Sequence, residues 1–364
     1  MHLNRLTLFN FKNYAEAEFS FGRGANAFTG LNGSGKTNIL DAIHYLCLCK
    51  SYFNSADTHA IRHGESFFSI SGAFDLDDTV EEVVVVVKAG QKKSVKRNQK
   101  EYQRLGDHVG LLPVVMEAPV DQELITGGSE ERRKLMDAII CQYDHQYLEH
   151  LVSYNRVLQQ RNALLKQSAR SGMSDASLWQ VWDEQLAFYG RKVFEFRKSF
   201  MEQFLPLFTS SYHYLTGEKE MAGIHYVSQL SEEPLENILT RNLQKDLVLQ
   251  YTSAGIHKDD LVLTLNGHPV KRTGSQGQQK SVILALKLAQ FHIIREAKGV
   301  KPLLLLDDIF DKLDLSRITR LMELVSKETF GQLFLTDTSE DHVRKVFEAI
   351  GVPLQIFPCA QPSL

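Results

Sequence analysis

Two hydrophobic periodicities alternate along the chain and together predict a mixed α/β protein. Near the start, apolar and polar residues alternate with a period of two, which is typical of half-buried strands. The first 120 residues are therefore predicted to form a β-rich part of an α/β lobe (1–120). The strands predicted there cover 3–9, 17–21, 25–30, 67–74 and 81–88.

The middle of the chain changes to a helical periodicity. Apolar residues recur every three or four positions over 121–140, 147–167 and 178–208, and a polar break at 168–177 separates the last two. Strand patterns then return, so we expect an inserted helical lobe at 121–244 and resumption of the α/β lobe at 245–364. The insertion is too short for a long coiled-coil arm. The late strands are predicted at 247–255, 261–266, 301–308 and 331–337.

The segment at 30–37 fits the phosphate-loop pattern G-x-x-x-x-G-K-[ST] and stands between a predicted strand and a predicted helix. Such glycines let the backbone fold around phosphate oxygens, and the helix N-terminus attracts negative charge. Lys36 is expected to reach the β- and γ-phosphates of ATP, and the Thr37 hydroxyl to bind Mg²⁺. The alternative is a glycine turn with an unrelated lysine. The predicted nucleotide-binding residues are Gly30, Leu31, Asn32, Gly33, Ser34, Gly35, Lys36 and Thr37.

Two acidic residues follow an all-apolar strand late in the chain. Four leucines at 303–306 precede Asp307 and Asp308, a pattern typical of a central buried strand that ends at a metal site. Asp307 is the candidate metal residue, together with Thr37. Asp308 is the candidate for polarising the attacking water, and because its side chain is one methylene shorter than glutamate we expect slow hydrolysis. An ordinary strand end or helix N-cap is the alternative.

A second glycine-containing helix entrance, TGSQGQQK at 273–280, precedes an apolar helical pattern. Ser275 can cap that helix and Gly277 allows close approach of the backbone, so the segment offers backbone N–H donors suited to a phosphate. A head-to-tail dimer would let this segment of one copy grip the nucleotide held by the loop of another. The alternative is a plain N-cap.

The overall charge of the chain neither requires nor excludes a DNA partner, so the candidate DNA contacts are local basic segments. The chain has 364 residues and a formal net charge of −3, so any DNA binding must come from local basic patches. The segment 88–104 holds seven basic residues and one acidic residue, which predicts a basic hairpin. Its lysines either bind DNA phosphates or prevent association at a sheet edge. A second candidate face consists of Arg132, Arg133, Lys134, Arg156 and Arg161.

The four cysteines and the hydrophobic runs indicate an ordinary intracellular protein. The cysteines form no C-x-x-C pair, which favours reduced thiols over zinc ligands. No apolar run approaches membrane-spanning length, and the N-terminus has no signal-peptide pattern. We therefore expect a cytoplasmic protein with no membrane partner.

Several blocks in order resemble one known family. The chain is similar to the ABC-type ATPase heads and, within them, to the RecF family of bacterial recombination mediators. The match spans nearly the whole chain, and such a series of blocks is highly specific. The blocks are FKNY at 11–14, GLNGSGKTNILDAIHYL at 30–46, GSEERRKLMD at 128–137, YNRVLQQRNALLK at 154–166, GIHKDDL at 255–261, GSQGQQKSVILALKLAQ at 274–290 and LLLLDDIFDKLD at 303–314.

The resemblance implies a weak, DNA-stimulated ATPase that needs ATP and Mg²⁺. It also implies a homodimer that forms on ATP at DNA gaps or junctions of double and single strands, and that assists RecA loading together with RecR and RecO. By the same resemblance, Ser275, Gly277 and Gln278 belong to the signature segment, and Asp314 to a dimer-facing turn.

The sequence departs from the family pattern at three places. Phe53 and Asn54 stand where an arginine is expected, and Ile256 replaces a usual proline. The strand at 331–337 is followed by no histidine of the usual ABC switch, so the residue that senses the γ-phosphate is unassigned. Two other functions stay open: an SMC-like structural or regulatory module that acts through a protein partner, and a small-molecule kinase. The segment at 273–280 argues against the kinase, because a monomeric kinase has no use for it.

Overall fold

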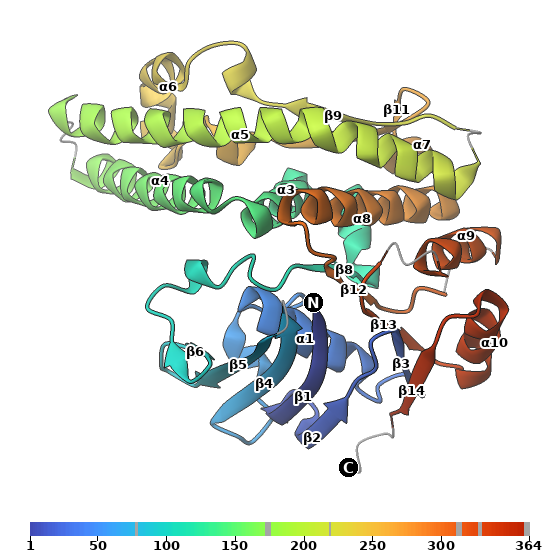
Figure 1. Cartoon of the computed structure of the whole chain (residues 1–364). Helices are drawn as coiled ribbons and strands as arrows, with labels where there is room; N and C mark the ends of the chain where they lie inside the picture. Colours follow the sequence, from blue (N-terminus) through green and yellow to red (C-terminus); the bar gives the residue numbers. More distant parts are fainter. Residues whose placement is uncertain (77–78, 172–175, 218–219, 311–314, 327–329, 360–364) are drawn as a thin grey trace. The chain divides into compact units, whose positions relative to one another are not determined.

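The computed structural model describes the whole chain except residues 77–78, 172–175, 218–219, 311–314, 327–329 and 360–364 (Figure 1). Two compact units make up the described chain. The first unit comprises 1–122, 210–219 and 275–364, and the second comprises 123–209 and 220–274. Sheets and helices occur in both units, which confirms the mixed α/β class predicted from the two periodicities.

A five-stranded parallel sheet forms the centre of the first unit. Its strand order is β14-β3-β13-β12-β8, and every neighbouring pair is parallel. All residues of β3, β8, β12 and β13 are buried, which explains why these segments lack an alternation of apolar and polar residues. The strands are β3 (Ala25–Thr29), β8 (Val114–Glu117), β12 (Leu303–Leu306), β13 (Leu333–Asp337) and β14 (Leu354–Pro358).

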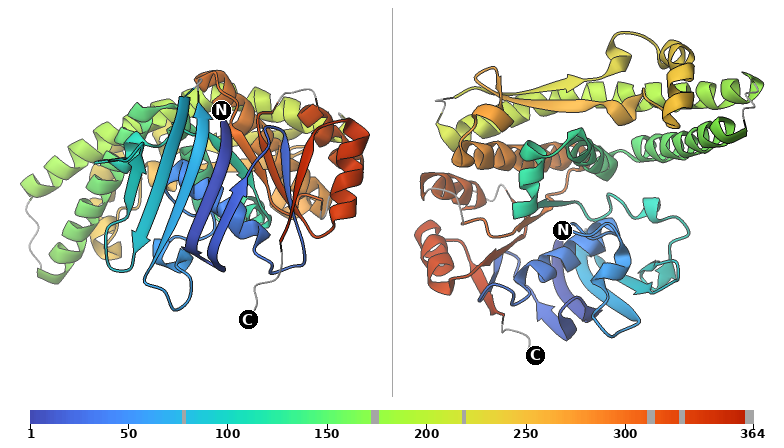
Figure 2. Two further views of the ribbon diagram at one scale, coloured as in Figure 1. Left: turned by 60° about the horizontal axis from the view of Figure 1, so that its bottom comes forward. Right: turned by 180° about the vertical axis from the view of Figure 1, so that it is seen from behind.

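An antiparallel sheet of six strands, in the order β2-β1-β4-β5-β6-β7, is the other sheet of the first unit (Figure 2, left view). Helix α1 (Lys36–Leu48) packs on both sheets, and its buried side chains share one core with β1, β4 and β5. Gly72 permits this approach, because a Cβ there would lie 2.7 Å from the Leu46 side chain. The strands are β1 (His2–Phe11), β2 (Tyr14–Ser20), β4 (Phe67–Leu76), β5 (Thr79–Lys88), β6 (Ser94–Arg97) and β7 (Lys100–Glu101).

Three further helices of the described chain lie wholly within the first unit. Helix α8 (Gln276–Lys298) packs on β8 with an almost wholly buried middle, and α10 (Glu340–Ile350) packs on α9 (Leu315–Ser326) and on β14. Both α8 and α10 begin at a serine whose side chain accepts a backbone N–H, and both end at a left-handed glycine. These local signals fix where each helix starts and stops.

The second unit is mainly helical and contains a small antiparallel sheet of order β11-β10-β9. Its strands are β9 (Ala222–Val227), β10 (Asp260–Leu265) and β11 (His268–Pro269). The last residues of α5 belong to the first unit. The helices are α2 (Glu123–Thr126), α3 (Ser129–Tyr143), α4 (His145–Ser171), α5 (Ala176–Thr216), α6 (Leu235–Leu249) and α7 (Val270–Thr273).

Two details differ from the sequence pattern. The strand predicted at 247–255 is wrong, because α6 continues to Leu249 and ends at the left-handed Gln250, while β9 was not predicted at all. The expected return to the α/β lobe at 245 also differs from the division of the chain, in which 220–274 stays with the second unit. The reason is that β10 pairs with β9 and packs on α3, all within that unit.

Within the described residues, no helix is both long and apolar enough to cross a bilayer. The described helices also include no pair that extends into a long coiled-coil arm (Figure 1).

Candidate nucleotide site

The segment 30–37 forms a tight loop between β3 and α1, as the pattern predicted. Gly30, Gly33 and Gly35 have φ values of 149°, 81° and 97°, which other residues rarely adopt. A Cβ at Gly30 would lie 2.4 Å from the Cys359 carbonyl oxygen, and one at Gly35 would lie 2.3 Å from the Asn13 side chain. Glycine is therefore required at 30 and 35 both by backbone conformation and by space.

The turn between β1 and β2 supports this loop from outside. Asn13 donates to the Ser34 carbonyl at 3.5 Å, and its Oδ1 accepts from Asn38 Nδ2 at 2.7 Å. The Tyr14 hydroxyl donates to the Gly35 carbonyl at 3.3 Å. Sequence reasoning did not assign a role to these two side chains, although they belong to the FKNY block that it singled out.

The loop carries hydrogen-bond donors suited to an anion. Helix α1 begins at Gly35 without a side-chain cap, so its first N–H groups have no side-chain acceptor there. Among the described residues, the buried Ser34 Oγ has no hydrogen-bond partner. Lys36 Nζ donates to the loop's own carbonyls, to Gly30 at 2.7 Å and to Leu31 at 3.0 Å. An orphaned hydroxyl and an ammonium held only by carbonyls fit a phosphate group.

The structure brings Thr37 and Asp307 together across 270 residues of sequence. Thr37 Oγ1 donates to the two carboxylate oxygens of Asp307 at 2.9 and 3.1 Å. Burial raises the pKa of the Asp307 carboxyl above its ordinary value, while hydrogen bonds from Thr336 and Thr37 oppose that rise. A hydroxyl beside a buried carboxylate is the donor set that Mg²⁺ prefers.

Asp308 adopts a strained backbone next to this pair. Its φ is 49°, and its N–H donates to Thr336 Oγ1 at 2.9 Å. The same Thr336 hydroxyl donates to Asp307 Oδ1 at 2.8 Å, so one threonine of β13 contacts the carboxylate of Asp307 and the backbone of Asp308. The sequence pattern missed Thr336 as a supporting residue. The available signal was its place at the end of a buried strand, where the ends of parallel strands meet.

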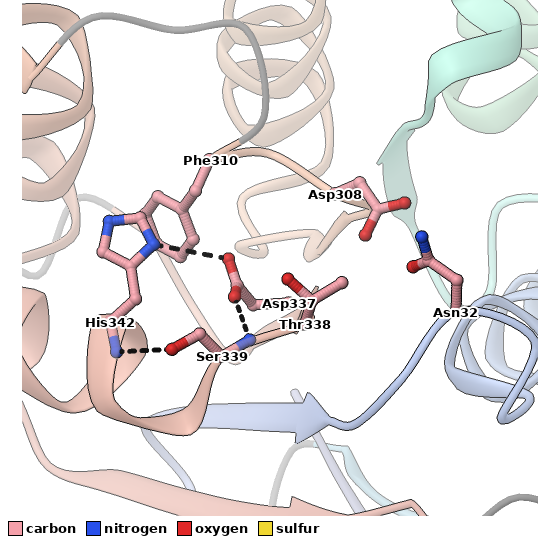
Figure 3. Close-up of a pocket in the computed structure, with 7 residues that line it drawn as sticks. All are labelled: Asn32, Asp308, Phe310, Asp337, Thr338, Ser339 and His342. Atoms are coloured by element: carbon pink, nitrogen blue, oxygen red, sulfur yellow. Dashed lines mark hydrogen bonds and ion pairs between the residues drawn. The ribbon is translucent and has the colours of Figure 1, made fainter.

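A pocket of about 390 Å³ opens beside the loop and the acids (Figure 3). Asn32 of the loop and Asp308 lie on one side, and Phe310 and His342 lie on the other. The remaining lining comes from the end of β13 and the start of α10. The lining residues are Asn32, Asp308, Phe310, Asp337, Thr338, Ser339 and His342.

The late serine–glycine turn lies elsewhere in the first unit, and none of its described residues lines this pocket. Ser275 accepts from the Gln278 N–H at 3.3 Å, and Gln278 Oε1 accepts from the Ser275 N–H at 2.7 Å. This capping box leaves Ser275 exposed, and a Cβ at Gly277 would lie 3.0 Å from the Arg317 guanidinium. Asp314, expected at a dimer-facing turn, lies outside the described residues.

The basic segment 88–104 forms the end of β5 and the short hairpin of β6 and β7. Arg97 pairs with Glu81 at 2.7 Å and Lys93 with Asp57 at 2.7 Å, so these two cations are already occupied. The other lysines of the segment have exposed side chains at the end of β5, in the turn after it, in β6 and in the edge strand β7. They are Lys88, Lys92, Lys96 and Lys100.

Within the second basic face predicted from the sequence, Arg161 is wrong as a surface cation. Arg161 is fully buried between Asp183 and Asp246, because a guanidinium inside a core must be paired. Arg132 forms an ion pair with Asp260 at 2.8 Å, and Arg133 donates to the Asp259 carbonyl at 2.6 Å. Lys134 pairs with Glu130 and Glu131, which leaves Arg156 as the exposed member without such a pair among the five.

No described group of three or more His, Cys, Asp or Glu residues could hold a metal ion by itself. His257 and Asp259 take part in a buried network of the second unit. His257 Nδ1 lies 2.7 Å from the Tyr154 hydroxyl, and Asp259 Oδ2 accepts from Arg197 at 2.7 Å. The four cysteines are free thiols, with Cys47 and Cys49 buried.

A phosphate-type loop and an acidic strand end on one parallel sheet, with an antiparallel sheet at its side, define a P-loop ATPase head of the ABC type. Comparison with known proteins agrees. The family model described as RecF/RecN/SMC N terminal domain matches residues 2–356. An Smc head domain derived from Pyrococcus furiosus shares the fold, with a TM-score of 0.55 at 18% identity over 96% of this chain and 91% of that one.

Two further matches are more specific. The DNA replication and repair protein RecF of Flavobacterium johnsoniae is 47% identical over 98% of this chain and 99% of that protein. A solved structure of the recombination mediator protein RecF with ATP, in the RecFOR pathway, has a TM-score of 0.85 at 31% identity over 93% of this chain and 92% of that one. The chain belongs to the RecF family, which confirms the resemblance seen in its sequence blocks.

Proposed function

We propose that this chain binds ATP with Mg²⁺ at the loop 30–37 and hydrolyses it slowly. The contact between Thr37 and Asp307 carries the proposal, because it unites the two halves of a nucleotide site from distant parts of the chain. The orphaned Ser34 hydroxyl and the uncapped start of α1 support a phosphate at the same place. The structural relative described with ATP agrees with this assignment.

Each predicted residue has a separate task in this proposal. Loop N–H groups and Lys36 would hold the phosphates, and Thr37 and Asp307 would hold Mg²⁺, which supplies positive charge to the phosphate oxygens when bound. Asp308 would orient the attacking water. Its short side chain and its fixed, strained backbone leave little freedom to approach the water, in accord with slow turnover.

We further propose that ATP joins two copies of the chain. Ser275 is exposed at the N-terminus of α8, Gly277 and Gln278 beside it are half-buried, and none of the three lines the described pocket of its own copy. A second copy placed head to tail would bring this turn to the nucleotide, where its N–H groups suit the γ-phosphate.

The ATP-bound dimer is proposed to act on DNA in recombinational repair and replication restart. Its substrates would be gaps and junctions of double and single strands, and with RecR and RecO it would assist RecA loading. The names of the relatives, a replication and repair protein and a mediator of the RecFOR pathway, support this role. The exposed lysines of the segment 88–104 are the candidate DNA contact, and they would bind phosphates without reading bases.

Fluorescence anisotropy with gapped DNA tests the function directly. The full chain is titrated into labelled gapped DNA with ATP, with ADP and without nucleotide, at moderate salt. We expect tighter binding with ATP. An affinity that ATP leaves unchanged and that equals background would instead favour an SMC-like module acting through a protein partner, the second candidate.

A further inference from the structure

One lysine of the basic segment 88–104 reaches the helix that begins at the phosphate loop. Lys93, in the connection between β5 and β6, donates from Nζ to the Cys49 carbonyl oxygen at 2.7 Å. The same ammonium lies 2.7 Å from Asp57 Oδ2 and 3.4 Å from the Tyr45 hydroxyl. Tyr45 lies in the last turn of α1 and Cys49 is the C-cap of that helix. The candidate DNA segment therefore contacts the far end of the phosphate-loop helix.

These four residues form one closed cluster. The fully buried Tyr45 donates from its hydroxyl to Asp57 Oδ1 at 2.5 Å, and the Lys93 ammonium lies 5.4 Å from the centroid of the Tyr45 ring. The side chains of Lys93 and Asp57 are only 18% and 29% exposed, so solvent weakens this ion pair less than it weakens a pair on the open surface. The cluster therefore restrains Lys93 in one position.

Lys93 supplies a charge that α1 lacks at its C-terminus. The last turn of α1 contains no basic residue, and Cys49 adopts a left-handed conformation with a φ of 55°. The final carbonyl groups of a helix carry partial negative charge, which a nearby cation stabilises, whereas the N-terminus attracts an anion. Helix α1 thus has the proposed phosphate site at one end and Lys93 at the other, about 20 Å away for its 13 residues.

A second connection runs from Asp57 to the same loop. Asp57 begins the 3₁₀-helix η1 (Asp57–Ala60), which packs on β5. At the end of η1, the Ala60 carbonyl accepts the Lys12 N–H at 2.8 Å. The next residue, Asn13, contacts the phosphate loop and the first turn of α1. The cluster is therefore joined to the nucleotide site both through α1 and through the turn between β1 and β2.

The other basic residues of the segment differ from Lys93 in their surroundings. Four lysines are exposed and are the candidate contacts for DNA phosphates, and Lys92 directly precedes Lys93. Arg97 pairs with Glu81 of β5, within the antiparallel sheet. Like charges so close in sequence repel one another, and bound DNA phosphates would cancel that repulsion. The hairpin, and Lys93 with it, would then be held more firmly.

We propose that Lys93 is the positioning residue through which DNA bound at the hairpin speeds ATP hydrolysis. One ligand affects a distant second ligand through an element that both sites bias, and α1 has one site at each end. With DNA bound, Lys93 holds the C-terminus of α1 more firmly, and α1 in turn fixes Lys36 and Thr37 at the phosphates and Mg²⁺. The inference rests on the proposed nucleotide site and on the proposed DNA contact.

Phosphate release by the full chain, measured in ATP and Mg²⁺ with and without gapped duplex DNA, tests this role. Fluorescence anisotropy in the same buffer sets a DNA concentration that saturates each variant. DNA should raise the wild-type rate about fivefold or more, the lower end of the usual coupling between two sites. The ratio of the rates with and without DNA is the readout, because a loss of folded protein lowers both rates and leaves their ratio unchanged.

Three single variants and one double variant separate the contributions. Lys93→Gln should keep its affinities for ATP and DNA and its rate without DNA, but DNA should no longer raise that rate. Asp57→Asn removes the ion pair and leaves the Cys49 contact, so it should lower the ratio in part even if Lys93→Gln folds poorly. The double variant should equal Lys93→Gln, because both changes act on one contact. Arg97→Gln breaks another ion pair of the same segment and is the matched control, which should keep the wild-type ratio.

The outcomes distinguish this inference from the function on which it rests. A wild-type ratio in Lys93→Gln would overturn the inference, and so would an equal loss of the ratio in Arg97→Gln, which would assign the effect to the hairpin as a whole. Wild-type protein that hydrolyses ATP at a rate that DNA leaves unchanged would contradict the inference alone. Wild-type protein that neither binds nor hydrolyses ATP would contradict the proposed function as well.

Discussion

At the scale of single residues, the proposed site depends on side chains whose polar atoms are organised before a ligand arrives. Thr336 donates to the Asp307 carboxylate and accepts from the Asp308 N–H, so one hydroxyl connects the two residues. Asn13 and Tyr14 hold the backbone of the loop in the same way. Such preorganisation lowers the cost of ordering the site when nucleotide binds.

Lys36 gives the most direct test of the loop. Lys36→Met should weaken ATP binding about 100-fold or more, because hydrogen bonds from a charged group to phosphate contribute about 1.5–3 kcal/mol each. Equilibrium dialysis with labelled ATP measures the loss. Lys50→Met, at an exposed lysine of the same unit, is the matched control. Full ATP affinity and normal ATP-linked dimers in Lys36→Met would contradict the loop assignment.

Asp308 separates binding from turnover. Asp308→Asn should keep ATP affinity but slow hydrolysis about 100-fold, the usual contribution of a positioned general base. The variant should accumulate as an ATP-bound dimer, visible by light scattering. Phosphate release at the wild-type rate would exclude Asp308 from the reaction.

At the scale of elements, the N-terminus of helix α8 has two proposed roles, to cap the helix and to contact a phosphate. The side chains of Ser275 and Gln278 form a capping box there, and Ser275 is nevertheless exposed to solvent. An N-cap needs only a side-chain acceptor, whereas a phosphate contact also needs open space and no negative charge. Substitutions that keep one property and remove the other can therefore separate the two roles.

Two substitutions at Ser275 apply this reasoning. Ser275→Asp preserves the cap and should leave the thermal stability of the monomer nearly unchanged, but its charge should repel a γ-phosphate held by another copy. Ser275→Arg should block dimerisation by its size. Both variants should bind ATP as monomers in light scattering. A loss of ATP affinity as large as that of Lys36→Met would show that Ser275 contacts the nucleotide bound by its own copy. Unchanged ATP-linked dimerisation would show that Ser275 only caps the helix.

At the scale of the whole molecule, a formal net charge of −3 provides no general attraction to DNA. Binding must therefore come from restricted surfaces, and several candidate cations proved to be engaged in ion pairs. The exposed lysines at the end of β5 and on the β6–β7 hairpin are the clearest remaining patch. Lysines on an edge strand also discourage sheet-to-sheet association, so the patch has two possible uses.

Salt dependence distinguishes these two uses. Replacing Lys92, Lys96 and Lys100 by Gln should reduce the slope of log affinity against log salt by about 0.9 for each DNA phosphate that the variant no longer neutralises. The matched control replaces the exposed lysines Lys166, Lys198 and Lys245 of the second unit. An unchanged slope together with self-association of the hairpin variant would assign these lysines to edge protection.

Sequence reasoning predicted the local structure of the candidate site where that structure depends on short patterns. The glycines of the loop, the leucine strand before Asp307 and the cap at Ser275 all have the predicted local structure. It failed where a residue acts through distant neighbours. Thr336 and Asn13 support the site only through contacts with other elements, and Arg161 looked like a surface cation until its buried partners were known.

The sequence by itself determined the periodicities, the glycine positions and the order of the family blocks, because each depends on backbone conformation or burial within a short segment. Only the tertiary structure decided which segments meet. It joined Thr37 to Asp307 across the ends of parallel strands, and it set His342 beside Asp337 in the pocket. The physical reason is that sheet order and helix packing bring distant residues together, and short-range patterns carry no information about those pairings.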